Sequence, residues 1–196
     1  MQTDLILKNL NESIHLELEE ANFFCSLLEE ERIKRKGYLL KAGSVCRYQY
    51  FVVEGCLKVG YWDTYGVEHV VKFAIENWWA LDLESFATNT PAFYTIQALE
   101  DTRVLKISRP NMDIVHERIP AFEKFSRLLY QNAYIALQRR ITQNLASKAE
   151  ERYQHFLEKY PGLNQRISQK YIASYLGITP EFLSMLRRKE LKPVIS

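Results

Sequence analysis

Hydrophobic residues recur along the chain with two different periods. Between residues 16 and 28 they return every three or four positions, which is the spacing of one helix face. From about Arg32 the pattern changes to short runs rich in Val, Tyr and Phe, separated by glycines. These runs predict an antiparallel β-roll similar to a jelly roll. They lie at residues 38–41, 50–53, 57–62, 67–73, 94–99 and 103–107.

Helical spacing returns after the last of these runs. Ser108 and Pro110 predict the start of a helix that ends near residue 118, because serine caps helices and proline suits a first turn. Residues 121 to about 143 predict one long helix, since an apolar stripe continues through them without glycine or proline. Such a helix would be more than about 30 Å long. A further helix is expected at residues 147–159.

Two interpretations of the long apolar stripe stay open. It could pack on the chain's own roll, or it could pair with a second copy of the chain. Asn132 and Arg139 interrupt any strict heptad, so the preference for pairing is modest. The expected dimer contacts are Phe125, Leu128, Leu129, Asn132, Ile135 and Ala136.

The last forty residues have the pattern helix, tight turn, helix. Ser168 is expected to cap the first helix and Gly177 to end it, because glycine adopts the left-handed conformation without steric cost. Thr179 is expected to cap the second helix, with Pro180 at its first position. The predicted inward residues are Ile172, Ala173, Leu176, Ile178, Leu183 and Leu186.

The outer faces of these two helices are polar and basic, which is typical of a DNA-reading element. The second helix would present base contacts from its N-terminal residues, and basic groups would contact phosphates. From residue 139 onward the chain has eleven basic and five acidic residues, while the remainder has a net charge of −4. An ordinary helical hairpin is the alternative. The expected DNA-contacting residues are Ser168, Gln169, Lys170, Thr179, Pro180, Glu181, Ser184, Met185, Arg187, Arg188 and Lys189.

Taken together, these segments resemble the Crp/Fnr family of bacterial transcription regulators over nearly the whole chain. Residues 37–71 resemble that family's effector-domain roll, and residues 96–108 resemble its closing strands. The resemblance implies an α+β chain with a cyclic-nucleotide-binding-type roll (1–120), a dimerisation helix (121–145) and a DNA-binding domain (146–196). It implies a homodimeric regulator of transcription whose partners are double-stranded DNA and a second copy, with RNA polymerase as a further candidate.

The sequence departs from the family at the position of the effector pocket. Cyclic-nucleotide-binding members carry a Gly-Glu pair for the ribose and an Arg-Ser pair for the phosphate, whereas Ala92 and Phe93 stand where the Arg and Ser are expected. Without a cationic fork a phosphate would lose its hydration with too little in return, so we expect no cyclic AMP binding. The aromatic residues here are expected to fill the space as core rather than to line a pocket. The candidate positions for an unidentified small-molecule effector are Trp78, Trp79, Asp82, Ala92, Phe93 and Tyr94.

Two further departures lie near the end of the chain. Met185 stands where many relatives have an arginine, so the operator sequence is expected to differ from the family's usual one. Only residues 190–196 follow the second helix, which is too short for the β-hairpin wing of most relatives. Both departures keep an alternative function open, a ligand-sensing or protein-interaction module with weak or no sequence-specific DNA binding.

The remaining chemistry of the sequence indicates neither an enzyme nor a metalloprotein. No hydrolase, metalloprotease or nucleotide-binding motif occurs, and the acidic runs at residues 29–31 and 150–151 are interpreted as solvated helical surface. The three cysteines are too few for a four-cysteine cluster and are expected to be small buried hydrophobes. No metal or cofactor is expected. A cytoplasmic location without membrane attachment is expected, because no leader-like segment or long apolar run is present.

Overall fold

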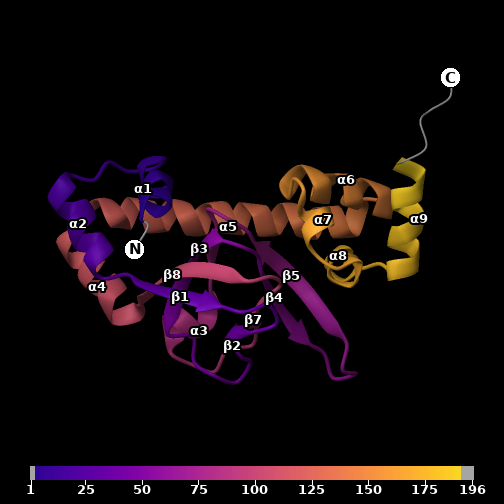
Figure 1. Cartoon of the computed structure of the whole chain (residues 1–196), viewed down its shortest axis with the longest axis horizontal. Helices are drawn as coiled ribbons and strands as arrows, with labels where there is room; N and C mark the ends of the chain where they lie inside the picture. The colour runs from indigo at the N-terminus through magenta and orange to yellow at the C-terminus, as the bar shows by residue number, and fades with distance from the viewer. Residues whose placement is uncertain (1–2, 191–196) are drawn as a thin grey trace. The chain divides into compact units, whose positions relative to one another are not determined.

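The computed structural model describes residues 3–190, which divide into two units (Figure 1). The first unit takes in Met1–Tyr61 and Lys72–Ala133, and the second takes in Trp62–Val71 and Tyr134–Ser196, as far as these ranges are described. The tip of one β-hairpin, residues 62–71, therefore belongs to the same unit as the C-terminal helices. The predicted α+β class is confirmed, with antiparallel sheets, a long helix and C-terminal helices.

Two four-stranded sheets form the basis of the first unit. One sheet has the strand order β1-β8-β3-β6 and the other has the order β2-β7-β4-β5. Neighbouring strands with a defined register are antiparallel, as the short apolar runs separated by glycines predicted. The strands are β1 (Glu29–Ile33), β2 (Tyr38–Leu40), β3 (Tyr48–Glu54), β4 (Leu57–Trp62), β5 (Glu68–Ala74), β6 (Trp79–Ala80), β7 (Thr95–Ala98) and β8 (Thr102–Ser108).

Strand β1 contradicts the interpretation of residues 29–31 as helical surface. In the antiparallel pair of β1 with β8, Glu29 lies opposite Lys106. The ammonium nitrogen of Lys106 is 3.4 Å from the Glu29 carboxylate and 2.9 Å from that of Glu31, which is on the same strand face. Cross-strand pairing of opposite charges stabilises this strand, although an acidic run by itself does not predict one. The acidic residues Glu150 and Glu151 do lie in a helix, as predicted.

Helices pack around these sheets and extend the core of the first unit. Ser108 caps α4 by accepting a hydrogen bond from the Asn111 amide, as predicted. The first half of α5 contributes to the core through Phe122, whose ring centroid lies 4.8 Å from that of Phe24. The helices of this unit are α1 (Asp4–Asn11), α2 (Leu18–Ser26), α3 (Leu83–Thr88), α4 (Arg109–Arg118) and the first half of α5 (Ala121–Ala146).

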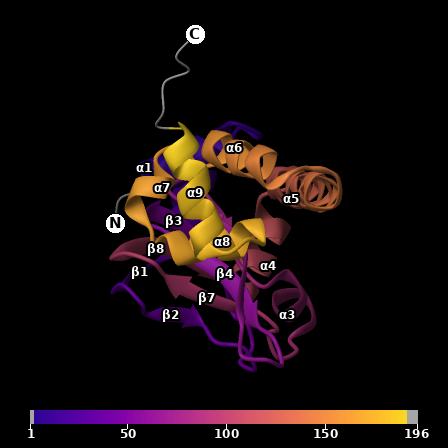
Figure 2. The ribbon, with the colours of Figure 1, turned by 90° about the vertical axis from the view of Figure 1, so that its right-hand side faces the viewer.

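Four short helices and the second half of α5 make up most of the second unit. They are α6 (Ala149–Lys159), α7 (Leu163–Arg166), α8 (Gln169–Leu176) and α9 (Pro180–Glu190), and Figure 2 views α5 nearly end-on beside them. Aromatic rings fill their centre: Phe156 lies 5.4 Å from Tyr160 and 5.8 Å from Tyr175 between centroids. None of the described helices is long and apolar enough to cross a membrane. The expectation about a missing wing concerns residues 191–196, which lie outside the described part of the chain.

Candidate nucleic-acid interface and effector pocket

The turn between α8 and α9 has the local geometry that the sequence predicted. Gly177 adopts the left-handed conformation with φ of 65°, and the Ile178 amide donates to the carbonyl of Ala173 at 3.1 Å. The hydroxyl of Thr179 caps α9 by accepting from the Phe182 amide at 3.2 Å. Ser168 lies at the N-cap position of α8, but its side chain makes no capping hydrogen bond, which corrects the prediction for that residue.

The two helices meet through their apolar faces. Ile172, Ala173, Leu176, Leu183 and Leu186 are all buried, as predicted, whereas Ile178 is only half-buried. This burial fixes the angle between α8 and α9, because a packed core resists changes in spacing. The two helices are therefore held against each other by a shared apolar contact.

Two arginines hold the C-terminal end of α8. Arg152 of α6 donates to the carbonyl of Leu176 at 3.2 Å, and Arg140 of α5 donates to the carbonyl of Tyr175 at 3.0 Å. Carbonyls in the last turn of a helix lack partners within the helix, so cationic donors there stabilise its end. Burial lowers the pKa of Lys159, and the nearby charge of Arg140 lowers it further. Neither arginine was singled out from the sequence, since their acceptors lie far along the chain.

The outer faces carry the residues that the sequence analysis proposed for DNA. Gln169, Ser184 and Arg187 are half-buried, and the other eight are exposed. Among residues 3–189, no carboxylate forms an ion pair with Arg187, Arg188 or Lys189. Phe182 is 36% exposed on the same helix, and the sequence analysis did not include it. The exposed residues of the predicted set are Ser168, Lys170, Thr179, Pro180, Glu181, Met185, Arg188 and Lys189.

Helix α5 divides its apolar residues between a buried half and an exposed half. Phe125, a predicted dimer contact, is buried with its ring centroid 6.0 Å from that of Trp79, so it belongs to the chain's own core. Of the other predicted contacts, Asn132 is exposed, and Leu128, Leu129, Ile135 and Ala136 are half-buried. A second stripe, spaced three, four and four residues apart, is at least 49% exposed. It consists of Tyr134, Leu137, Ile141 and Leu145.

Asp82 occupies the centre of the effector-pocket region with a buried carboxylate. It caps α3 by accepting from the Ser85 amide at 3.1 Å, and its second oxygen accepts from the amides of Phe93 at 3.1 Å and Tyr94 at 3.0 Å. The side chain is only 3% exposed. The side chain of Asp82 thus already accepts hydrogen bonds from three amides of this region.

The aromatic residues of this region behave mainly as core, as expected. Trp79 is 5% exposed, and its indole N–H donates to the side-chain oxygen of Asn9 at 3.0 Å. Trp78 is half-buried against the same core. Phe93 differs, because it is 59% exposed and packs on Tyr61 and Tyr94 with centroid distances of 5.0 and 5.1 Å. Ala92 is buried beside it.

The cysteines carry no sign of a metal or redox site. Cys46 and Cys56 are buried, as expected, whereas Cys25 is half-buried. Burial raises the pKa of the Cys46 and Cys25 thiols above the ordinary value, which keeps both protonated at neutral pH. Within the described residues, no group of three His, Cys, Asp or Glu side chains is arranged to hold a metal ion.

A family model and several solved structures are similar to this architecture. Residues 30–118, which include all but the first residue of the two four-stranded sheets, match the cyclic nucleotide-binding domain family. Solved structures of Crp/Fnr regulators share the fold over most of the chain, so the predicted resemblance to that family is confirmed as a likeness of fold. No curated protein sequence matches the chain.

Three solved structures illustrate the likeness. FixK2 from Bradyrhizobium japonicum superposes with a TM-score of 0.73 at 15% identity, covering 83% of each chain. A variant of CooA from Carboxydothermus hydrogenoformans gives 0.69 at 19% identity, covering 93% of this chain and 83% of that one. A Crp/Fnr family transcriptional regulator from Eubacterium rectale gives 0.68 at 16% identity, covering 89% and 83%.

Proposed function

We propose that this protein is a transcription regulator that binds double-stranded DNA as a homodimer through α8 and α9. The observation that carries the proposal is a capped, tightly turned helix pair whose second helix has an exposed basic end without ion-pair partners among residues 3–189. Residues 1–120 form the effector domain in this account, residues 121–145 the dimerisation helix and residues 146–196 the DNA-binding domain. The fold shared with transcription regulators supports this assignment.

The proposed roles on DNA follow from position along the helices. Pro180, Glu181, Ser184 and Met185 lie in the first half of α9 and face the base edges, whose pattern of donors and acceptors specifies sequence. Lys170, Arg187, Arg188 and Lys189 neutralise phosphates. Ser168, Gln169 and Thr179 lie at the N-termini of α8 and α9, where backbone amides attract phosphate oxygens.

The exposed stripe of α5 is the proposed dimer surface. Leu145 is 83% exposed and Tyr134 is 61% exposed, although both lie on one face of a 26-residue helix. An apolar face of this kind is stable in water when a matching helix covers it, and parallel pairing of α5 in two copies would do so. Asn132 lies about half a turn away from this stripe, on the face that also carries Leu128, Leu129 and Ile135. Charge introduced by Leu137→Glu should shift the protein to monomer in sedimentation velocity, whereas Ala146→Glu, an exposed control on the opposite face of α5, should not.

We propose further that the roll does not respond to cyclic AMP. A cyclic phosphate entering the loop would meet the buried carboxylate of Asp82, which already uses the amides of Ser85, Phe93 and Tyr94. It would find Ala92 and Phe93 where a cationic fork and a hydroxyl are required. Isothermal titration with cyclic AMP should give no heat of binding, and saturable binding would contradict this part of the account.

A specific observation favours one alternative function. Met185 is 40% exposed and Phe182 is 36% exposed on α9, and such a surface also suits a protein partner. In that alternative the helix pair serves as an interaction or ligand-sensing module with weak DNA binding. The dependence of binding on salt separates the two functions, because only phosphate neutralisation releases counterions in proportion to the contacts made.

The experiment that tests the proposal replaces two basic residues of α9 together, Arg187→Ala and Arg188→Ala. The double variant should weaken DNA binding and reduce the slope of log K against log salt by about 3 to 4 for the dimer. The matched control is Arg32→Ala with Lys34→Ala, which removes two charges with side chains 79% and 90% exposed in the first unit. Equal slopes for the two double variants would contradict the proposed role of α9.

A further inference from the structure

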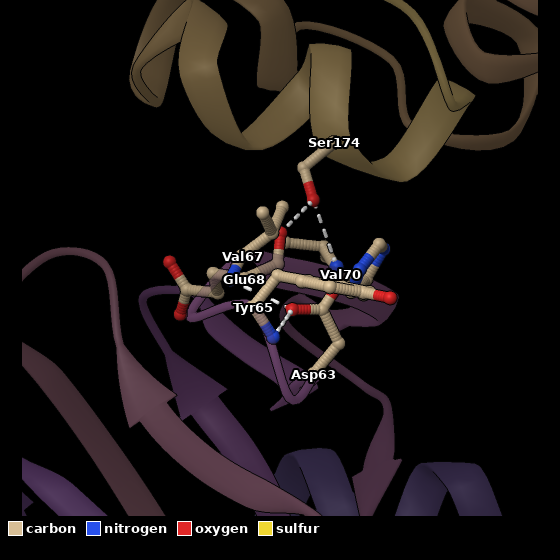
Figure 3. Close-up of polar contacts among 7 residues, drawn as sticks. Asp63, Tyr65, Val67, Glu68, Val70 and Ser174 are labelled. Atoms are coloured by element: carbon tan, nitrogen blue, oxygen red, sulfur yellow. Dashed lines mark hydrogen bonds and ion pairs between the residues drawn. The ribbon is translucent and has the colours of Figure 1, made fainter.

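The free edge of strand β5 is closed by a side chain of the helix-turn-helix. Strand β5 stands at the end of its sheet, so the backbone groups on its outer edge need other partners. The hydroxyl of Ser174 in α8 donates to the carbonyl of Glu68 at 2.7 Å and accepts from the amide of Val70 at 2.9 Å (Figure 3). The hydroxyl of a serine within a helix often donates to a backbone carbonyl one turn earlier. The Ser174 hydroxyl instead makes the hydrogen bonds to β5 that a neighbouring strand would make.

Arg140 of α5 completes this contact from a second direction. Its guanidinium donates to the carbonyl of Val70 at 3.1 Å and to that of Tyr175 at 3.0 Å, and it stacks 4.1 Å from the centre of the Tyr175 ring. One side chain therefore links α5, β5 and α8. We call Ser174 and Arg140, with the backbone of Glu68 and Val70, the clasp.

The hairpin tip that the clasp holds is internally braced. The carboxylate of Asp63 accepts from the amides of Tyr65 and Val67, each at 2.9 Å, and lies 2.7 Å from the imidazole of His69 (Figure 3). The hydrogen bond from His69, followed by that from Val67, lowers the pKa of Asp63 below its ordinary value, so the brace is charged at neutral pH. Contacts to one carboxylate thus hold the turn between β4 and β5.

The clasp contacts α8 and leaves the exposed face of α9 uncovered. Ser174 and Tyr175 belong to α8, and the described contacts of the clasp include no residue of α9. Pro180, Glu181 and Arg188 on α9 stay exposed while the clasp is closed. A closed clasp is thus compatible with access of DNA to α9, and it restricts the directions in which α8 and α9 can point.

We propose that Ser174 and Arg140 are positioning residues for DNA recognition, which orient the helix-turn-helix by fixing α8 to the edge of β5 and to α5. This inference rests on the proposed function. It assigns to Ser174 and Arg140 a role in setting the distance between the two copies of α9 in a dimer. A reading element held in one orientation loses less conformational freedom on binding, so affinity is gained for sites of matching spacing. The same restriction penalises sites whose half-sites are closer together or further apart.

The test compares wild type with Ser174→Ala, Ser174→Thr and Arg140→Lys. Ser26→Ala is the matched control, because the Ser26 hydroxyl also donates to a backbone carbonyl, in the first unit and far from the clasp. Affinity is measured by fluorescence anisotropy on the two-fold symmetric site that wild type selects, and on duplexes with one or two base pairs inserted or deleted between the half-sites. Hydrogen exchange of the Val70 amide reports independently whether the clasp is closed.

Ser174→Ala should bind the selected site about three- to tenfold more weakly, with much smaller losses on altered spacings, so that the preference for spacing flattens. Val70 should exchange faster in this variant, while Ser174→Thr and Ser26→Ala should resemble wild type. Arg140→Lys cannot reach both carbonyls and should also flatten the preference.

Other outcomes would overturn the inference. An equal loss at every spacing would assign the clasp a purely structural role, and unchanged affinity and spacing in Ser174→Ala would give it none. Rapid exchange of Val70 in wild type would mean that the clasp is open in solution. If wild type itself selected no DNA, the proposed function would be wrong, and this inference, which depends on it, would be wrong as well.

Discussion

Replacing Asp82 by alanine should destabilise the first unit by about 3–5 kcal/mol. The carboxylate accepts three backbone hydrogen bonds at 3.0–3.1 Å while it is 3% exposed. Hydrogen bonds to a charged group contribute about 1.5–3 kcal/mol each. The lower value applies here, because Phe93 is exposed and water can reach its amide once the carboxylate is gone. Asp82→Asn keeps one acceptor oxygen and should lose only about 1–2 kcal/mol.

The assay is urea unfolding followed by tryptophan fluorescence, since Trp78 and Trp79 lie in the first unit. Glu84→Ala is the control, because Glu84 is exposed in the same helix, and its effect should stay within about 0.5 kcal/mol. A loss below about 1 kcal/mol in Asp82→Ala would refute the reasoning. It would mean that water replaces the carboxylate without cost and that the loop is open to an outside anion.

Three further predictions concern the turns and the hairpin tip. Gly55→Ala should lower the free energy of unfolding in urea by more than about 2 kcal/mol, because the φ of Gly55 is 101° and an added Cβ would lie 2.8 Å from the Thr102 Cα. A smaller loss of stability would contradict this close approach. Gly177→Ala should cost only about 1–2 kcal/mol, because its φ is 65° but the space around it is open, and a loss as large as that of Gly55→Ala would be unexpected. Since the pKa of Asp63 is lowered from 3.8, its brace is intact above that value and is lost as the pH falls through the lowered pKa. The Val67 amide, followed by NMR between about pH 5 and about pH 2, should lose protection on acidification, and an identical transition in Asp63→Asn would exclude this carboxylate as the cause.

Local signals predicted the parts of the fold that local chemistry determines. Ser108, Thr179 and Gly177 define helix ends by their own side chain or by its absence, and each has the predicted conformation or hydrogen bond. The short runs rich in Val, Tyr and Phe located most strands for the same reason, because these residues favour strands and the glycines between them favour turns. Such features depend on neighbours within a few residues.

Features that depend on distant partners were missed or misjudged. The acidic residues of β1 can lie in a strand because they pair with Lys106 on β8, which is more than seventy positions away in the sequence. Ser174 has an ordinary sequence context for a helix, and only the fold brings it to the edge of β5. Asp82 was included among the pocket candidates, but its three amide donors come from two separate segments that no spacing rule connects.

The long helix illustrates an intermediate case. Its existence and approximate length followed from the apolar stripe, yet the stripe could not distinguish the part that packs on the chain's own core from the part that stays exposed. Phe125 meets Trp79 across the fold, whereas Ile141 is left 51% exposed. Periodicity reveals that a face is apolar, and only tertiary structure reveals what covers it.

The central claim is tested most directly by selecting bound fragments from random duplex DNA with the purified protein and titrating the selected site against salt. The account predicts a two-fold symmetric site with half-sites about one helical turn apart. It also predicts a slope of log K against log salt of about −7, because Lys170, Arg187, Arg188 and Lys189 in each of two protomers would neutralise phosphates. Selected fragments without two-fold symmetry, together with a slope close to zero, would contradict it.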